Sequence, residues 1–144
     1  MKDLNINAAR KLIEAYKNVI EKVKEKPDLI NKSVSVSDYL GKETGFGDPD
    51  FCYLCKESVE ILKSNYDHLK ETMANHYCEY CIYSIYSHEA ETRSDRFDLF
   101  CVGTKSSLKS YSAIFESTTD REFIKALEER IAFIEKTLTK IKEM

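Results

Sequence analysis

The sequence lacks the features that take a chain into or across a membrane. It has no apolar stretch long enough to cross a bilayer, and its start, Met1 to Asn5, shows neither the apolar run nor the small-residue cleavage site of a signal peptide. Of its 144 residues, 42% are hydrophobic and 33% are charged, which is typical of a soluble globular protein of one domain. We therefore expect a single cytoplasmic domain over residues 1–144, with no membrane contact.

The sequence also lacks a surplus of positive charge. Its 22 basic and 25 acidic residues give a net charge of −3. Neutralising nucleic-acid phosphates usually requires a basic surplus or stripe, so the composition excludes a globally basic nucleic-acid binder. Residues 1–32 nevertheless carry eight Lys or Arg against five Asp or Glu, which leaves room for a local basic face on the first helix.

Apolar residues near the start of the chain repeat with helical spacing, which predicts an amphipathic helix from Asn7 to Lys26. Asn5 or Asn7 can cap its start, and Pro27 supplies a stop. The residues expected on its apolar face are Ala9, Leu12, Ile13, Tyr16, Val19, Ile20 and Val23.

The last segment predicts a second long helix. Thr119 and Glu122 form a capping-box pattern at its start. The apolar positions that follow alternate spacings of three and four, which is typical of a narrow seam that packs against another helix, in the same chain or in a second copy. This seam consists of Ile124, Leu127, Ile131, Ile134, Leu138 and Ile141.

Glycine breaks the chain between these two helices. Three of the four glycines and Pro49 lie in residues 33–51, so we expect a loop there with at most a short strand at Ser33–Ser37. A third helix is expected to begin near Cys55, residues 84–98 to form an exposed loop, and residues 105–116 to form a shorter helix. The predicted fold is therefore mostly α, a small helical bundle with long N- and C-terminal helices.

Four of the five cysteines form two C-x-x-C pairs, Cys52 with Cys55 and Cys78 with Cys81. Each pair places two sulfurs on one side of a tight turn, and two such turns supply the four thiolates that Zn²⁺ favours in structural sites. A reducing compartment and an odd number of cysteines both argue against a disulfide framework. A redox dithiol would need a βαβ context that is absent here. The sequence therefore predicts one central structural Zn²⁺ bound by these four cysteines.

A straight helix over residues 57–76 would be incompatible with a shared site, because its ends would lie about 30 Å apart. The two pairs can share one ion only if this helix breaks, and Ser64 to Asp67 is where we expect the break. The alternative is a site made from the second pair, Cys101 and a histidine. That site needs no break but leaves the first pair short of ligands.

The histidines offer little support for a catalytic metal. His68, His76 and His88 are expected at the surface or at an interface, because no two of them form an H-E-x-x-H pair. The run that begins His88-Glu89 superficially resembles the H-x-E of zinc deaminases, but that chemistry also needs a downstream P-C-x-x-C and an open zinc position. Both cysteine pairs precede His88 and neither follows a proline, so we expect no enzyme, with a zinc hydrolase as the alternative.

Four tyrosines recur at every third position around the second pair: Tyr77, Tyr80, Tyr83 and Tyr86. Such a row can stack bases or anchor a protein partner. Tyrosine also suits half-buried positions, so we favour the interpretation that part of the row packs over the zinc site. The Lys and Arg residues of the helices are expected on solvated faces.

Four short runs carry a further pattern: Thr44-Gly45-Phe46-Gly47, Cys52-Tyr53-Leu54-Cys55, Cys78-Glu79-Tyr80-Cys81 and Cys101-Val102-Gly103-Thr104. They resemble the motifs of small uncharacterised zinc-binding proteins of phages and mobile elements, which show C-x-L-C, C-x-x-C and a later C-x-G-T. The similarity covers about residues 44–111, and Ile82 stands where such proteins often have proline. The resemblance implies a shared zinc site, with Cys101 as a further candidate ligand, and an accessory protein that binds a host component.

Our leading functional hypothesis is a non-enzymatic, zinc-stabilised protein-interaction protein, because the sequence offers helix-pairing seams and a metal motif but no convergent catalytic set. By the resemblance, its protein partner would be a host defence protein that it inhibits. The alternative is a nucleic-acid-binding zinc module that uses the lysines of the first helix and the tyrosine row. A homodimer formed through the helices is a further hypothesis.

Overall fold

A computed structural model describes residues 4–47, 52–65, 80–82 and 105–142 of the chain. These residues form five helices and, among them, no strand, so the expected helical bundle is confirmed. The helices are α1 (Ile6–Glu25), α2 (Val36–Thr44), α3 (Tyr53–Asn65), α5 (Lys105–Phe115) and α6 (Asp120–Lys142). No helix in this part of the chain is both long and apolar enough to span a membrane.

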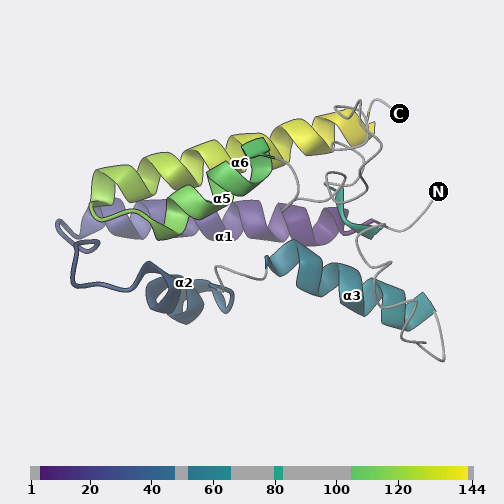
Figure 1. Ribbon diagram of the computed structural model, residues 1–144, viewed down its shortest axis with the longest axis horizontal. Coiled ribbons are helices and arrows are strands. Elements are labelled where there is room, and N and C mark those ends of the chain that lie inside the picture. The colour runs from purple at the N-terminus through teal and green to yellow at the C-terminus, as the bar shows by residue number, and fades with distance from the viewer. Residues whose placement is uncertain (1–3, 48–51, 66–79, 83–104, 143–144) are drawn as a thin grey trace.

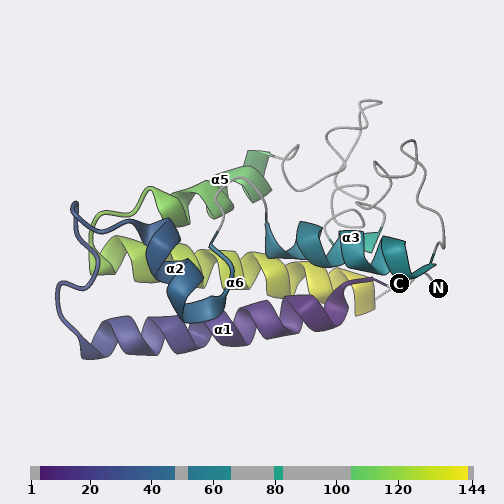
Figure 2. The same ribbon diagram turned by 90° about the horizontal axis from the view of Figure 1, so that it is seen from below.

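The two long helices, α1 and α6, run antiparallel side by side and form the centre of the molecule (Figure 1). The shorter α5 confirms the helix predicted over residues 105–116. It folds back along α6. Figure 2 shows α2 and α3 one after the other on the same face of the molecule. There α2 contacts α1 and α5, and α3 contacts α1. The N-terminal end of α1 and the C-terminal end of α6 therefore lie together.

The apolar face of α1 agrees with the prediction at every position. All seven expected residues are buried: Ala9, Leu12, Ile13, Tyr16, Val19, Ile20 and Val23. The helix ends at Glu25, two residues before Pro27. Pro27 lacks the backbone N–H that an extended helix would need there, which explains the position of the end.

The seam of α6 is divided between the core and the surface. Leu127, Ile131, Ile134 and Ile141 are buried, whereas Ile124 and Leu138 are half-buried. The capping pattern is also modified. Thr119 Oγ1 accepts a hydrogen bond from the Glu122 N–H at 3.1 Å, as predicted, but the Glu122 carboxylate accepts from both the N–H and the hydroxyl of Thr118.

The prediction of a loop over residues 33–51 is wrong, because α2 occupies Val36–Thr44. Ser35 caps this helix by accepting a hydrogen bond from the N–H of Asp38 at 3.2 Å, and Gly45 ends it in the left-handed conformation at φ 84°. The number of glycines in the segment predicts a loop throughout it. Gly45 instead marks a helix end, and Gly41 is tolerated within the helix.

The prediction that the basic residues of the helices lie on solvated faces is wrong for Arg130, which is only 1% exposed. Its guanidinium donates to Ser110 Oγ at 2.8 Å and lies over the rings of Tyr111 and Phe133, 5.1 and 5.4 Å from their centroids. Because Ser110 and Tyr111 belong to α5, this buried arginine fastens α5 to α6. Helical periodicity does not reveal such a position.

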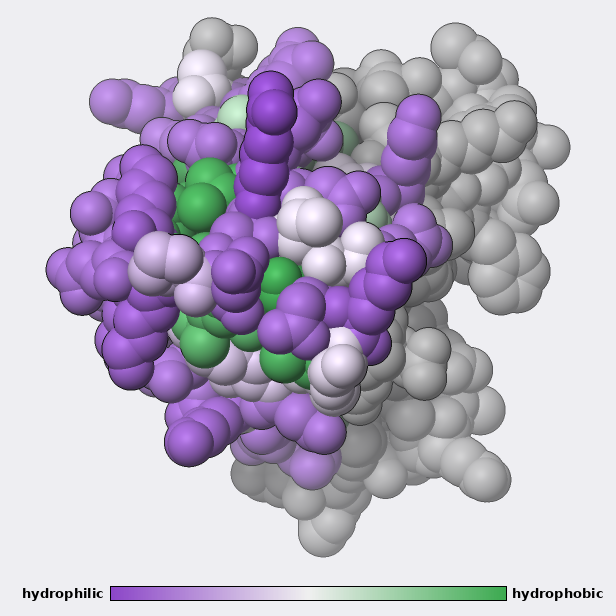
Figure 3. All heavy atoms as spheres, turned by 90° about the vertical axis from the view of Figure 1, so that its left-hand side faces the viewer, coloured by the Kyte–Doolittle hydropathy of each residue, from purple (hydrophilic) through white to green (hydrophobic). Residues whose placement is uncertain are grey.

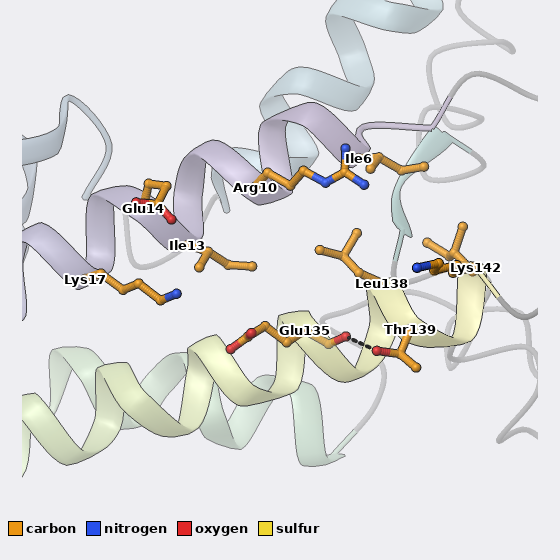
Figure 4. A pocket seen from close by; sticks show the side chains of 10 residues that line it. Ile6, Arg10, Ile13, Glu14, Lys17, Glu135, Leu138, Thr139 and Lys142 are labelled. Carbon is orange, nitrogen blue, oxygen red and sulfur yellow. Dashed lines mark hydrogen bonds between the residues drawn. The ribbon is translucent and has the colours of Figure 1, made fainter.

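Two of the grooves on the described surface lie between α1 and α6. The larger, of about 750 Å³, has an apolar floor that includes Ile13 and Leu138 and a rim that carries Arg10, Lys17 and Glu135 (Figure 4). The smaller, of about 570 Å³, lies at the other end of the two helices and is lined by residues that include Ile124. Figure 3 shows this second end, where small apolar areas lie among hydrophilic side chains.

Candidate metal centre

Three of the four predicted zinc ligands lie in the described part of the chain. Cys52 directly precedes α3, Cys55 lies in the first turn of α3, and Cys81 lies in the segment 80–82. Their exposed fractions are 5%, 8% and 4%, and all three belong to one apolar core. The other candidate ligands lie outside the described residues: Cys78, Cys101, His68, His76 and His88.

The side chain of Asn5 joins the two segments that carry these cysteines. Its Oδ1 accepts a hydrogen bond from the N–H of Ile82 at 3.0 Å, and its Nδ2 donates to the carbonyl oxygen of Leu54 at 2.5 Å. Nδ2 also donates to the hydroxyl of Ser58 at 2.8 Å, and the backbone N–H of Asn5 donates to the carbonyl oxygen of Tyr80 at 2.9 Å. Asn5 is 3% exposed, so these hydrogen bonds are shielded from water.

These bonds limit the separation of the two cysteine segments. Leu54 immediately precedes Cys55, and Ile82 immediately follows Cys81. One amide group and two hydrogen bonds span the Leu54 oxygen and the Ile82 nitrogen, so these atoms are at most about 8 Å apart. Figure 1 shows segment 80–82 beside the N-terminal end of α1. The segments of Cys55 and Cys81 therefore lie next to each other.

In this arrangement the segments of Cys55 and Cys81 are not separated by the length of a straight helix. Segment 80–82 lies at the first turn of α3, whereas one straight helix over residues 57–76 would have placed the cysteine pairs about 30 Å apart. The structure includes Ser64 and Asn65 in α3. The rest of the expected break, Tyr66 and Asp67, lies outside the described residues.

The described cysteines do not make a metal centre by themselves. Within residues 4–47, 52–65, 80–82 and 105–142, no three His, Cys, Asp or Glu side chains form a group that could hold a metal ion. Cys52, Cys55 and Cys81 are all among these residues and do not form such a group. Zinc ligation, including the alternative with Cys101, stays a prediction, and so does the hydrolase alternative with His88 and Glu89.

The run Thr44 to Gly47 turns the chain from α2 toward Cys52. The hydroxyl of Thr44 accepts a hydrogen bond from the N–H of Phe46 at 3.2 Å, which closes a tight turn. Its single proton lies between two carbonyl oxygens, that of Leu40 at 2.6 Å and that of Phe46 at 2.9 Å. A side chain at Gly47 would collide with the backbone of α2, since a Cβ there would lie 2.6 Å from the nitrogen of Gly41. The structure thus gives both glycines of this T-G-F-G run a backbone role.

Aromatic side chains cover the start of α3. The rings of Phe46 and Tyr53 stack with centroids 4.3 Å apart and an interplanar angle of 20°. The buried phenol of Tyr16 lies within electrostatic reach of Cys52 and Arg130. Burial raises the pKa of Tyr16 well above its ordinary value, the Cys52 thiol adds to this rise, and Arg130 opposes it. Tyr16 is therefore an uncharged core residue at physiological pH.

Sequence reasoning missed the structural role of Asn5, which it assigned only as a helix cap, and of Ser58, which it did not single out. Asn5 does occupy the N-cap position of α1, but its side chain makes no capping hydrogen bond. A polar residue that bonds to a segment 77 positions away leaves no periodic signal in the sequence.

The tyrosine row is described only at Tyr80, which is buried. Burial of its ring is consistent with packing and unfavourable for base stacking, which needs an accessible face. Tyr77, Tyr83 and Tyr86 lie outside the described residues.

Comparison with protein-family models, with curated proteins and with solved structures finds no match to this chain.

Proposed function

We propose that this protein is a non-enzymatic, zinc-stabilised protein-interaction protein whose Zn²⁺ is bound by Cys52, Cys55, Cys78 and Cys81. The observation that carries the zinc part is the Asn5 amide, which bonds to the residue before Cys55 and to the residue after Cys81. Four thiolates form a closed tetrahedral site with no position for water. The ion would therefore act on folding rather than on chemistry.

The environment of the described cysteines supports this choice of metal. Thiolates are the preferred ligands of structural zinc, and burial in apolar surroundings shields the metal–sulfur bonds from solvent. Cys55 lies in the first turn of α3, where the positive end of the helix dipole favours the ionised thiol. Cys52 and Cys55 therefore suit one half of a tetrathiolate site.

The groove between α1 and α6 supports the interaction part of the proposal. The charged residues of its rim form no ion pair with another described residue. These rim residues are Arg10, Glu14, Lys17, Glu135 and Lys142. Leu138 points into the groove from α6 and Ile13 from α1 (Figure 4). An amphipathic helix of a partner protein fits this combination, with its apolar side on the floor and its charges against the rim.

The resemblance of the cysteine motifs to phage and mobile-element proteins suggests the kind of partner. In that setting the partner would be a host protein, such as a defence protein that this chain inhibits. Affinity capture of host proteins on the full-length chain, followed by reconstitution of the complex from purified components, tests this form. Failure to reconstitute any stoichiometric complex would count against it.

Two substitutions on α6 test the groove. Leu138→Glu should abolish the reconstituted complex, because it places a charge on the apolar floor. Ile124→Glu is the matched control, since Ile124 is a half-buried residue of the same seam in the other groove. Light scattering of the free protein at several concentrations would reveal a homodimer instead. Equal binding by both variants would contradict the proposed surface.

The ligand set is tested by zinc content in single-cysteine variants. Cys81→Ser should lose stoichiometric zinc, whereas Cys101→Ser should keep it, because Cys101 is outside the proposed set. Zinc lost in Cys101→Ser and retained in Cys52→Ser would favour the alternative set instead.

A further inference from the structure

Asn5 stands at the N-cap of α1 but does not use its side chain to cap the helix. An asparagine at this position ordinarily accepts a hydrogen bond from the N–H of the second or third helical residue. In this protein the Oδ1 of Asn5 accepts instead from Ile82, 77 positions along the chain. The helix thus forgoes a local stabilising bond, and the side chain serves a long-range contact.

We propose that Asn5 is a positioning residue for zinc, which sets the distance between the Cys52–Cys55 turn and the segment of Cys81 before the metal binds. The proposal rests on the zinc site proposed above. A metal-binding site gains affinity when its ligands are held near their final positions, because less conformational freedom is lost on binding. Groups that orient the ligands without touching the metal typically change affinity about 10- to 100-fold when they are removed.

The hydrogen bonds at Asn5 account for each of its side-chain polar hydrogens. Its two Nδ2 hydrogens are donated to the Leu54 carbonyl and to the Ser58 hydroxyl, and its Oδ1 accepts from Ile82. The Ser58 hydroxyl can accept from Asn5 because its own proton is donated to Leu54 at 2.7 Å. A residue at position 5 must therefore donate twice and accept once.

Aspartate cannot meet this requirement. It would retain the acceptor for Ile82 but lose both donors, and its carboxylate would face the Leu54 carbonyl oxygen in a buried site. Alanine would lose all three bonds. Neither change affects the backbone N–H of Asn5, which would still donate to Tyr80.

The same network links the metal to the two long helices. Asn5 directly precedes α1, and α1 packs along α6. Zinc that holds the segment of Cys81 in place would therefore also fix the start of α1. Bound zinc would therefore stabilise the N-terminal end of α1 and the cysteine segments together.

The test measures zinc affinity of the full-length chain by competition with a chromophoric chelator. Asn5→Ala should weaken zinc binding by about 10- to 100-fold, and Asn5→Asp by a similar factor. Asn7→Ala is the matched control, because Asn7 is an exposed asparagine two positions away and should leave affinity unchanged. Ser58→Ala, which removes only one of the three bonds, should weaken binding by a smaller factor.

Cobalt substitution supplies a readout that a purely structural role would not move. The visible absorption of Co²⁺ bound to thiolates depends on the geometry of the sulfurs, so it should change in Asn5→Ala and remain unchanged in Asn7→Ala. If Asn5→Ala does not fold, Ser58→Ala carries the same test.

The outcomes separate this inference from the proposal on which it rests. Wild-type protein without zinc would overturn the zinc site itself. Wild-type protein that binds zinc, with affinity and cobalt spectrum unaltered in both Asn5→Ala and Ser58→Ala, would overturn the positioning role alone.

Discussion

Asp120 Oδ1 accepts a hydrogen bond of 2.6 Å from the backbone N–H of Ile30, across 90 positions of the chain. Asp120 is the first residue of α6, and Ile30 is a buried residue that follows the end of α1. The bond therefore ties the loop after α1 to the start of α6, at the end of the bundle opposite the cysteines. It also places a negative charge at the N-terminus of α6, where the helix dipole favours it.

Removal of this bond should destabilise the protein. Asp120→Ala leaves the Ile30 N–H without its acceptor and should lower the free energy of unfolding by about 1–3 kcal/mol. Asp120→Asn retains an acceptor oxygen at the same position and should lower it by less. Urea unfolding of the three proteins checks the order, and equal losses in the two variants would show that the charge, rather than the hydrogen bond, matters.

Gly41, inside α2, and Gly47, in the turn that follows α2, should respond to alanine in opposite directions. Gly47→Ala brings a Cβ to 2.6 Å from the Gly41 nitrogen, so the turn must shift and the Phe46–Tyr53 stack with it. We expect a loss of about 1–3 kcal/mol in the free energy of unfolding, as for other steric overpacking.

Gly41→Ala serves as the control, because a Cβ at Gly41 has nothing within 4 Å and the residue lies inside α2. It should stabilise the protein by about 0.5–1 kcal/mol through the higher helix propensity of alanine. Denaturant unfolding of both variants measures the difference. A destabilised Gly41→Ala, or a neutral Gly47→Ala, would contradict the backbone described for this turn.

The carboxylate of Glu122 should contribute to the pH dependence of stability. The backbone N–H and hydroxyl of Thr118 donate to it and hold its pKa below the ordinary value. A carboxylate whose pKa is lowered by folding stabilises the native state above its unfolded pKa, and this contribution disappears as the pH falls through the folded pKa.

The comparison with Glu122→Gln isolates this contribution. Wild-type protein should be more stable than the variant near neutral pH, and the difference should shrink as the pH falls from about 5 toward 3. A constant difference in the free energy of unfolding over this range would show that the carboxylate charge does not contribute.

The sequence predicts the long helices well because their buried faces repeat with the helical period. Every expected core residue of α1 is buried, and the α6 seam is buried except at Ile124 and Leu138, which line the two grooves. For α2 the number of glycines predicts a loop, although two local signals in the sequence indicate a helix. Those signals were the N-cap Ser35 and the C-terminal Gly45.

The candidate site was predictable only in part. The C-x-x-C spacing identifies the cysteines, because ligand spacing is a local property. The contacts that bring Cys55 and Cys81 together pass through Asn5, which is distant from both in sequence. Helix periodicity carries no information about such a residue, nor about a buried cation such as Arg130. Both follow from tertiary packing.

The zinc site is tested first by the metal content of the wild-type protein, measured by elemental analysis with the protein concentration determined independently. We expect about one zinc ion per chain, retained through purification and lost with the fold when a strong chelator is added. A folded protein without metal, in which all five cysteines react as free thiols, would contradict it.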